Sequence, residues 1–204
     1  MGKVLADESK ENGISINLGP GGNLHRNILC GRHPEYYSED PILTGTLMAY
    51  QARGLEENGV IATYKHLIAN NMEFERKSAH GIIDENTLRD LYLRVFDKAF
   101  SLYKPGCVMT SYNPVNGIYP CENSALLNDL LRGEWGFDGF VMTDWGSYDT
   151  ADSIRSVCAG TNLLTPGSKK HFRMILKAVK RNEISKAALQ HSVKQIVKVL
   201  VRCI

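Results

Sequence analysis

The chain has 204 residues, which is enough for one sizeable domain or at most two small ones. Hydrophobic residues make up 43% of the sequence and charged residues 23%, an ordinary balance for a globular protein that argues against intrinsic disorder. The formal net charge of +2 and the dispersed basic residues predict neither a nucleic acid nor a membrane as a partner.

Apolar runs and turn signals predict strands and helices that alternate along the chain. In chain order we expect a helix at residues 2–11, a strand at 14–18, a helix at 41–57, a strand at 60–64, a helix at 85–102, a strand at 107–110, a helix at 124–132, a strand at 139–143, a helix at 150–159, a short strand at 162–164 and helices at 169–181 and 185–200. Three of these helices start at good N-cap residues, Asp40, Asp84 and Ser185.

The predicted strands are nearly continuous apolar runs, which is typical of a parallel sheet buried on both faces. Their alternation with helices fits a (β/α)-barrel or a doubly wound sheet. Neither G-x-G-x-x-G nor G-x-x-x-x-G-K-[ST] is present, so the main evidence for a nucleotide-binding sheet is missing. Because a full barrel takes ~250 residues, we predict an α/β fold over residues 1–204, an incomplete (β/α)8 TIM-like barrel with about five βα units.

Polar side chains follow the ends of the predicted strands. In chain order they are Arg26 and Arg32, then Lys65 and His66, then Tyr112 and Asn113, then Asp144 and Trp145. Barrel enzymes carry their chemistry at the C-terminal ends of the strands. This placement therefore predicts an enzyme before any motif is considered.

Asp144 ends the clearest strand and precedes Trp145 directly. A carboxylate there can attack the anomeric carbon of a sugar that stacks on the indole ring. It can equally be the N-cap of the next helix, and its position alone leaves both interpretations open. Tyr112 can hold such a carboxylate in place by a hydrogen bond, or it can be a half-buried aromatic residue at a strand end.

Several cationic side chains accompany the carboxylate. Lys65, His66 and Arg76 can keep it ionised and donate hydrogen bonds to sugar hydroxyls. A lysine at a strand end can also be merely exposed. Arg32 lies three residues before Glu35, so a structural ion pair is the alternative to a functional role for this arginine.

Other classes of enzyme find little support. The six histidines show no H-E-x-x-H spacing and no G-x-S-x-G elbow is present, so we predict no metal, no cofactor and no serine hydrolase. An aldolase that uses Lys65 as a Schiff base is conceivable.

Four segments resemble glycoside hydrolase family 3 in order and spacing. They are residues 32–41 (RHPEYYSEDP), 65–76 (KHLIANNMEFER), 109–117 (MTSYNPVNG) and 133–146 (GEWGFDGFVMTDWG). The resemblance implies a β-glucosidase-type or β-xylosidase-type hydrolase that cleaves terminal β-D-glycosides with retention, through a covalent glycosyl-enzyme. Asp144 lies at the position of the family's nucleophile. The residues that resemble the family's sugar-binding side chains are Arg32, Lys65, His66, Arg76, Met109, Tyr112 and Trp145.

The chain also departs from the family pattern. The α/β sandwich domain that supplies the acid/base residue and the first barrel segment are not recognisable, so we expect association with the missing sandwich domain. Residues 65–71 lack the K-H-F-P-G-H-G motif of the branch that uses a histidine dyad, which points away from N-acetylhexosaminidases. The expected partner is a small β-glycoside or an oligosaccharide. The alternative is a truncated or degenerate barrel that is not catalytic and binds sugars weakly at most.

Five widely spaced cysteines without a C-x-x-C pair predict reduced thiols rather than a disulfide scaffold. The first residues lack the apolar core of a signal peptide. We therefore expect a cytoplasmic location for the chain as it stands. If the chain is a fragment, this says little about its parent protein.

Overall fold

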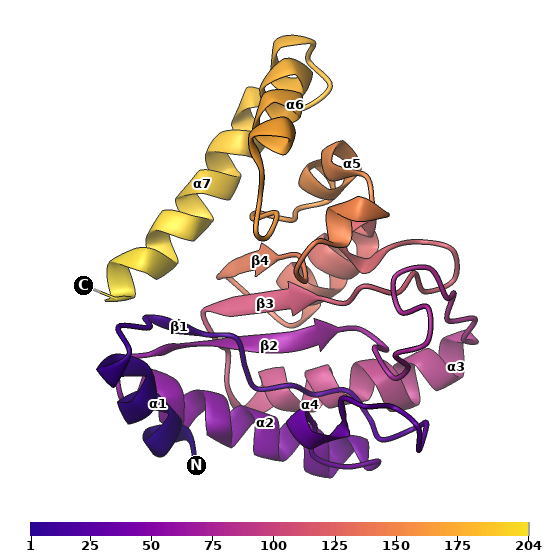
Figure 1. The fold of residues 1–204 in the computed structure, drawn as a ribbon, viewed down its shortest axis with the longest axis vertical. Helices are drawn as coiled ribbons and strands as arrows, with labels where there is room; N and C mark the ends of the chain where they lie inside the picture. Colours follow the sequence, from indigo (N-terminus) through magenta and orange to yellow (C-terminus); the bar gives the residue numbers. More distant parts are fainter. Residues whose placement is uncertain (204) are drawn as a thin grey trace.

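A parallel sheet forms the centre of the structure, a computed structural model that describes residues 1–203 (Figure 1). Within that range the sheet has four strands in the order of the sequence: β1 (Ile16–Asn17), β2 (Ile61–Leu67), β3 (Cys107–Thr110) and β4 (Phe140–Met142). A doubly wound sheet reverses its strand order at a switch point, whereas a barrel wall keeps the order of the chain. The predicted α/β fold, part of a (β/α)-barrel, is therefore confirmed.

Helical elements lie along this sheet and extend beyond β4. The helices are α1 (Gly2–Glu11), α2 (Pro41–Glu56), α3 (Glu85–Thr87), α4 (Arg94–Leu102), α5 (Ser153–Cys158), α6 (Lys169–Lys180) and α7 (Lys186–Leu200), with π-helical segments at Leu88–Leu93 and Ala125–Glu134 and 3-10 turns at His33–Glu35, Pro120–Glu122, Ser147–Asp149 and Val201–Cys203. Figure 1 shows α1, α2 and α4 together along one side of the sheet, while α5, α6 and α7 lie on the side of β4. Among residues 1–203, no helix is both long and apolar enough to cross a membrane.

Both faces of the sheet are buried, as the apolar runs predict. Every residue of β3 and β4 is buried, and in β2 only Lys65 is partly exposed. Along β3, Val108 joins the apolar cluster under the helices, whereas Cys107 and Met109 join a smaller cluster on the opposite face. Val199 of α7 packs against that smaller cluster. Packing on both faces therefore fixes the strands, and their C-terminal ends lie together at one edge of the sheet.

Local capping chemistry sets the starts of the main helices. Asp40 accepts a hydrogen bond from the Leu43 amide at 2.7 Å, and Asp84 accepts one from the Thr87 amide at 3.0 Å. Ser185 caps α7 in the same way through the Ala188 amide. These three predicted N-caps are confirmed, because each side chain satisfies an amide that has no partner within its helix.

The fifth predicted unit is smaller than expected. The strand predicted at residues 162–164 reduces to a single parallel bridge between Met142 and Leu163, and the first strand keeps only two of its five predicted residues. Where the fifth strand would pair with β4, the Asn162 side-chain oxygen accepts a hydrogen bond from the Val141 amide at 2.7 Å. A side chain thus replaces the backbone carbonyl that a strand would offer. The helix predicted at residues 150–159 begins only at Ser153.

Glu56, at the end of α2, joins the starts of two strands. Its Oε1 accepts hydrogen bonds from the backbone amides of Ala62 at 3.1 Å and Gly106 at 2.7 Å. Its Oε2 accepts one from the Tyr103 hydroxyl at 3.0 Å and pairs with Arg202. Since only 3% of its side chain is exposed, this carboxylate is a buried junction between α2, β2 and β3.

Candidate active site

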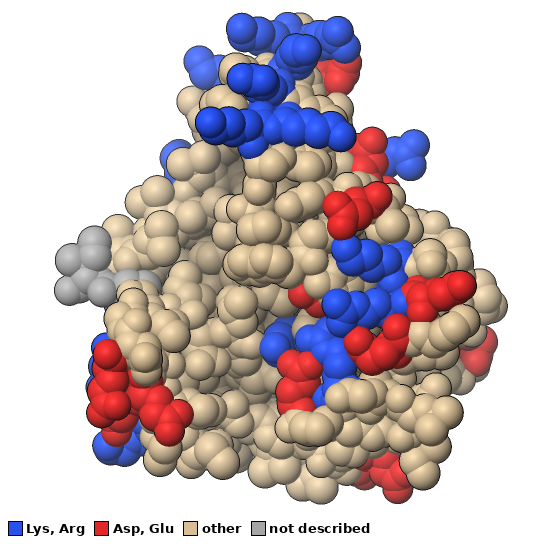
Figure 2. Space-filling view, viewed as in Figure 1, with Lys and Arg blue, Asp and Glu red and all other residues tan. Residues whose placement is uncertain are grey.

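The C-terminal edge of the sheet brings the predicted polar residues together. Lys65 and His66 belong to β2, Tyr112 follows β3 and Asp144 follows β4. Arg32 comes from the long connection between β1 and α2. On the face shown in Figure 2, blue and red side chains gather side by side where the ends of β2 and β3 lie in Figure 1. Parallel strands thus present side chains from distant parts of the chain at one place.

The Asp144 carboxylate is buried, with 6% of the residue exposed. Its Oδ1 accepts a hydrogen bond from the Trp145 amide at 2.7 Å. Its Oδ2 has no hydrogen-bond partner among the described residues, although Arg32 Nη1 lies 3.7 Å away and His66 Nε2 lies 3.4 Å away. Arg32 Nη1 is unpartnered as well. Since buried polar atoms are normally paired, these two atoms are suited to a polar group of a ligand.

The capping interpretation of Asp144 is wrong. The N-cap of α5 is Asp152, whose Oδ1 accepts from the amides of Ile154 and Arg155, both at 2.8 Å. Gly146 precedes the short turn at Ser147–Asp149, which has no side-chain cap. Asp144 therefore has no structural duty at a helix start.

Glu35 holds two of the predicted cations. Its carboxylate bonds Arg32 Nε through one oxygen and Lys65 Nζ, at 2.8 Å, through the other. Burial would raise the pKa of Glu35, but the hydrogen bonds and charges of Arg32 and Lys65 lower it. The ion pair expected for Arg32 is thus present, while the remaining guanidinium nitrogens face His66 and Asp144.

His66 lies behind the carboxylate and is fully buried. Arg32 Nη2 donates a hydrogen bond to its Nε2 at 2.7 Å. Its Nδ1 faces Asn23 Oδ1 at 3.2 Å and the Tyr36 hydroxyl at 3.1 Å. Burial, together with the charges of Arg32 and Lys65, lowers the pKa of His66 well below its ordinary value. The imidazole is therefore neutral at physiological pH.

Tyr112 and Arg76 form the next part of the wall. The Tyr112 hydroxyl donates to the Trp145 carbonyl at 2.7 Å, and the Arg76 guanidinium lies 4.7 Å above the phenol ring. Arg76 also pairs with Glu73 at 2.8 Å. Burial and the nearby Asp144 carboxylate raise the pKa of Tyr112 to about 12. Tyr112 is thus a neutral hydrogen-bond donor that orients the backbone directly after Asp144.

The last two predicted residues differ in exposure. Trp145 is 53% exposed, so part of its ring is open beside Asp144. Met109 is only 2% exposed and packs within the smaller apolar cluster. Trp145 therefore leaves part of its surface free for a ligand, whereas Met109 contributes to the apolar packing of the sheet.

Sequence reasoning missed several polar residues around this site. Asn23 and Tyr36 contact the His66 ring, and Asn70 Nδ2 donates to the Tyr36 hydroxyl at 3.1 Å. Lys77 donates to the Gly146 carbonyl at 3.1 Å and pairs with Asp149. These residues stand in glycine-rich or polar loops, where polarity is unremarkable. The one available signal was an asparagine among apolar and glycine neighbours, in the run GGNLH.

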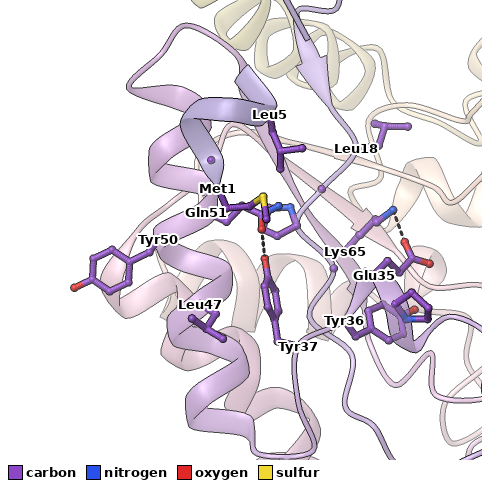
Figure 3. A pocket seen from close by; sticks show the side chains of 15 residues that line it. Met1, Leu5, Leu18, Glu35, Tyr36, Tyr37, Leu47, Tyr50, Gln51 and Lys65 are labelled. Atoms are coloured by element: carbon purple, nitrogen blue, oxygen red, sulfur yellow. Dashed lines mark hydrogen bonds and ion pairs between the residues drawn. The ribbon is translucent and has the colours of Figure 1, made fainter. Parts of the chain in front are cut away.

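A cavity of about 610 Å³ lies next to the site, between α1, α2 and the segment that follows β1. Figure 3 shows the Lys65–Glu35 pair on one wall, with Leu5, Leu47 and Tyr50 of the two helices on the other side. Asp144 does not line this cavity. Among the described residues no group of histidine, cysteine, aspartate or glutamate could hold a metal ion.

The comparison with protein families identifies the family of the chain. The model of the glycosyl hydrolase family 3 N-terminal domain matches residues 1–199. The chain belongs to glycoside hydrolase family 3. Its resemblance at the level of motifs is therefore confirmed over nearly the whole sequence.

The relatives are β-glucosidases. Thermostable beta-glucosidase B of Acetivibrio thermocellus is 41% identical over 201 residues, which cover 98% of this chain and 26% of that protein. A beta-glucosidase of Rhizobium radiobacter is 40% identical, with 98% of this chain and 24% of that protein covered. The chain thus spans about a quarter of the length of the curated relatives that it matches.

Solved structures of family 3 enzymes have the same fold. Beta-glucosidase 3B of Thermotoga neapolitana in complex with glucose superposes with a TM-score of 0.94 at 40% identity, covering 98% of this chain and 29% of that one. The family 3 β-glucosidase of Bifidobacterium adolescentis gives 0.93 at 35% identity, covering 99% and 30%. The described sheet and helices therefore correspond to part of the barrel domain of larger enzymes.

Proposed function

We propose that this chain is the nucleophile-bearing part of a retaining β-glycosidase that hydrolyses terminal β-D-glycosides. The observation that carries the proposal is the unpartnered, buried Asp144 Oδ2, which faces the unpartnered Arg32 Nη1 at the C-terminal edge of a barrel-type sheet. The glucose complex of the Thermotoga relative supports a sugar as the ligand.

The chemistry needs a carboxylate that attacks and an acid that protonates the leaving group. Asp144 Oδ2 would form a bond to the anomeric carbon while the bond to the leaving oxygen breaks, and water would later hydrolyse the glycosyl ester. Arg32 would hold a charge near the attacking oxygen and donate to a sugar hydroxyl. The exposed face of Trp145 offers a stacking surface for the sugar ring.

The acid/base residue has a different origin. The second carboxyl of a retaining enzyme lies ~5–5.5 Å from the nucleophile and has a raised pKa while it acts as an acid. Glu35 is unsuited, because Arg32 and Lys65 both bind its carboxylate and lower its pKa. We therefore assign the acid/base role to a residue of the parent enzyme outside the described chain, in an α/β sandwich domain that docks over this edge.

A trapping experiment tests the role of Asp144 without the acid. A fluorinated β-glucoside with a dinitrophenolate leaving group needs no protonation to react, so it can label the nucleophile in the purified chain. We expect peptide mapping by mass spectrometry to find the fluoroglucosyl ester on Asp144 and no label in Asp144→Asn. A label on any other residue, in the chain or in its parent enzyme, would refute the assignment.

The second candidate is a non-catalytic partial barrel. It is favoured by the open edges of the sheet, since β1 has a neighbour on one side only and β4 is followed by a single bridge. Open edges of parallel sheets are prone to association. Appreciable turnover of an aryl β-glucoside by the purified chain would reject this candidate.

The aldolase alternative is weak for a structural reason. A Schiff-base lysine must present its amine to a carbonyl carbon, whereas Lys65 Nζ lies 2.8 Å from the Glu35 carboxylate. That ion pair engages the nitrogen that would have to attack. Borohydride reduction in the presence of a carbonyl compound should leave Lys65 unmodified.

A further inference from the structure

The Asn23 side chain is clamped to the backbone of His66. Its Nδ2 donates to the His66 carbonyl at 2.9 Å, and its Oδ1 accepts from the His66 amide at 3.0 Å. A backbone amide can only donate and a carbonyl can only accept. The two bonds therefore fix which end of the Asn23 amide carries the oxygen, and both residues are buried.

That oxygen also faces the imidazole ring. Asn23 Oδ1 lies 3.2 Å from His66 Nδ1. An amide oxygen only accepts hydrogen bonds, so Nδ1 must carry a proton to bond it. The orientation of the Asn23 amide, set by the backbone, thus favours the tautomer of His66 with its proton on Nδ1.

The opposite ring nitrogen leads to the same tautomer by an independent contact. Arg32 Nη2 lies 2.7 Å from His66 Nε2. A guanidinium group only donates, so Nε2 must present its lone pair. The Tyr36 hydroxyl, 3.1 Å from Nδ1, can donate or accept and does not select a tautomer by itself.

The tautomer of His66 decides whether the imidazole can donate a hydrogen bond to the Asp144 carboxylate. His66 Nε2 lies 3.4 Å from Asp144 Oδ2. With the proton on Nδ1, two lone pairs face each other and no hydrogen bond forms. With the proton on Nε2, His66 would donate to Oδ2, and that bond would have to break before Oδ2 could attack a sugar.

We propose that Asn23 is a positioning residue for the reaction: by holding the proton of His66 on Nδ1, it keeps Asp144 Oδ2 free of a hydrogen bond from the imidazole. This inference rests on the proposed function, because it assumes that Oδ2 is the attacking atom. Asn23 touches neither Asp144 nor Arg32 in any described hydrogen bond and acts through His66 alone.

The tautomer is measured directly by ¹⁵N NMR of the chain labelled at histidine. Protonated and unprotonated ring nitrogens have well separated ¹⁵N shifts, and the His66 signals are assigned by their loss in His66→Gln. In the unmutated chain we expect a protonated Nδ1 and an unprotonated Nε2. Arg32 still favours the same tautomer through Nε2, so Asn23→Ala should produce a partial population with the proton on Nε2 rather than a complete change.

Two further variants separate this effect from damage to the fold. Asn23→Asp keeps the size and the acceptor toward Nδ1, but it loses the donor to the His66 carbonyl, as Asn23→Ala does, and adds a charge. It should retain the proton on Nδ1 and raise the pH at which the ring gains a second proton. The matched control is Asn71→Ala, since Asn71 bonds the Leu24 carbonyl, next to Asn23, and has no described contact with the His66 ring. This control should keep the unmutated spectrum.

The functional readout is the rate of trapping by the fluorinated β-glucoside. Asn23→Ala should slow the labelling step in proportion to the fraction of molecules that show the proton on Nε2 by NMR, so that half of the population in that form gives about a twofold loss, while the concentration for half-maximal rate changes by less than about threefold. A proton on Nε2 in the unmutated chain would overturn the proposal. So would an unchanged tautomer in Asn23→Ala, or a changed tautomer with an unchanged trapping rate. Labelling of a residue other than Asp144 would instead refute the proposed function and leave the NMR result standing.

Discussion

The buried imidazole of His66 predicts a specific acid sensitivity of the fold. Burial and the charges of Arg32 and Lys65 lower its pKa well below the ordinary value in the folded chain, whereas in the unfolded chain the pKa is about 6.5. Below that pH the unfolded state binds a proton that the folded state does not, so the free energy of unfolding falls with decreasing pH. At higher pH both states are neutral and this contribution to the pH dependence vanishes.

The size of the effect follows from the proton linkage. Each pH unit below about 6.5 costs about 1.4 kcal/mol, which amounts to roughly 2 kcal/mol at about pH 5 relative to neutral pH. Urea unfolding between these pH values, in the unmutated chain and in His66→Gln, isolates the contribution because the carboxylates are common to both proteins. The matched control is His80→Gln, an exposed histidine whose replacement should leave the pH dependence of the unmutated chain. Equal pH dependence in the unmutated chain and in His66→Gln would refute the reasoning.

Two further predictions concern the stability of the scaffold and use the same unfolding assay. Glu56→Ala should lower the free energy of unfolding by about 3 kcal/mol or more, because it leaves the buried amides of Ala62 and Gly106 without an acceptor. The neighbouring Glu57 is 56% exposed and pairs only at the surface. Glu57→Ala should therefore lower the free energy of unfolding by less than about 0.5 kcal/mol. Equal losses for the two glutamates would contradict the account. Gly45→Ala should also destabilise, since the added Cβ would lie 2.4 Å from the Val95 carbonyl oxygen at the contact of α2 with α4; the cost of overpacking, about 1–3 kcal/mol, exceeds the gain of up to about 1 kcal/mol in helix propensity. If Gly45→Ala instead raised the free energy of unfolding, α2 and α4 would have to move apart without cost, which would contradict the prediction.

Much of the scaffold could be predicted because its signals are local. Asp40, Asp84 and Ser185 cap helices through amides three residues away, so a short window of sequence contains both partners. The strands are apolar at consecutive positions because helices cover one face and a second cluster covers the other. The apolar runs also show where the strands end. Because the ends of parallel strands lie at one edge, the proximity of Lys65 and Asp144 could be predicted as well.

Features that depend on distant partners could not be predicted. His66 of β2 bonds Asn23, which lies in the loop after β1, and no local pattern connects the two. The predicted fifth strand does not form beyond a single bridge, because the Asn162 side chain accepts hydrogen bonds from the Val141 amide and from Arg132. Apolar patterning does not reveal these side-chain bonds. Asp144 looks suited as a helix cap in the sequence, and only the backbone path after β4, which gives that place to Asp152, excludes this role.

The role of Asp144 as the attacking carboxylate is tested most directly by chemical rescue. Asp144→Gly leaves room for azide where the carboxylate stood, and a β-glucoside with a dinitrophenolate leaving group requires no acid. The account predicts that Asp144→Gly, in the chain or in the parent enzyme that carries it, loses activity, that azide restores it, and that the product is the α-glucosyl azide, because azide attacks from the face of the missing nucleophile. A variant that keeps its activity, or a β-glucosyl azide as product, would contradict the account.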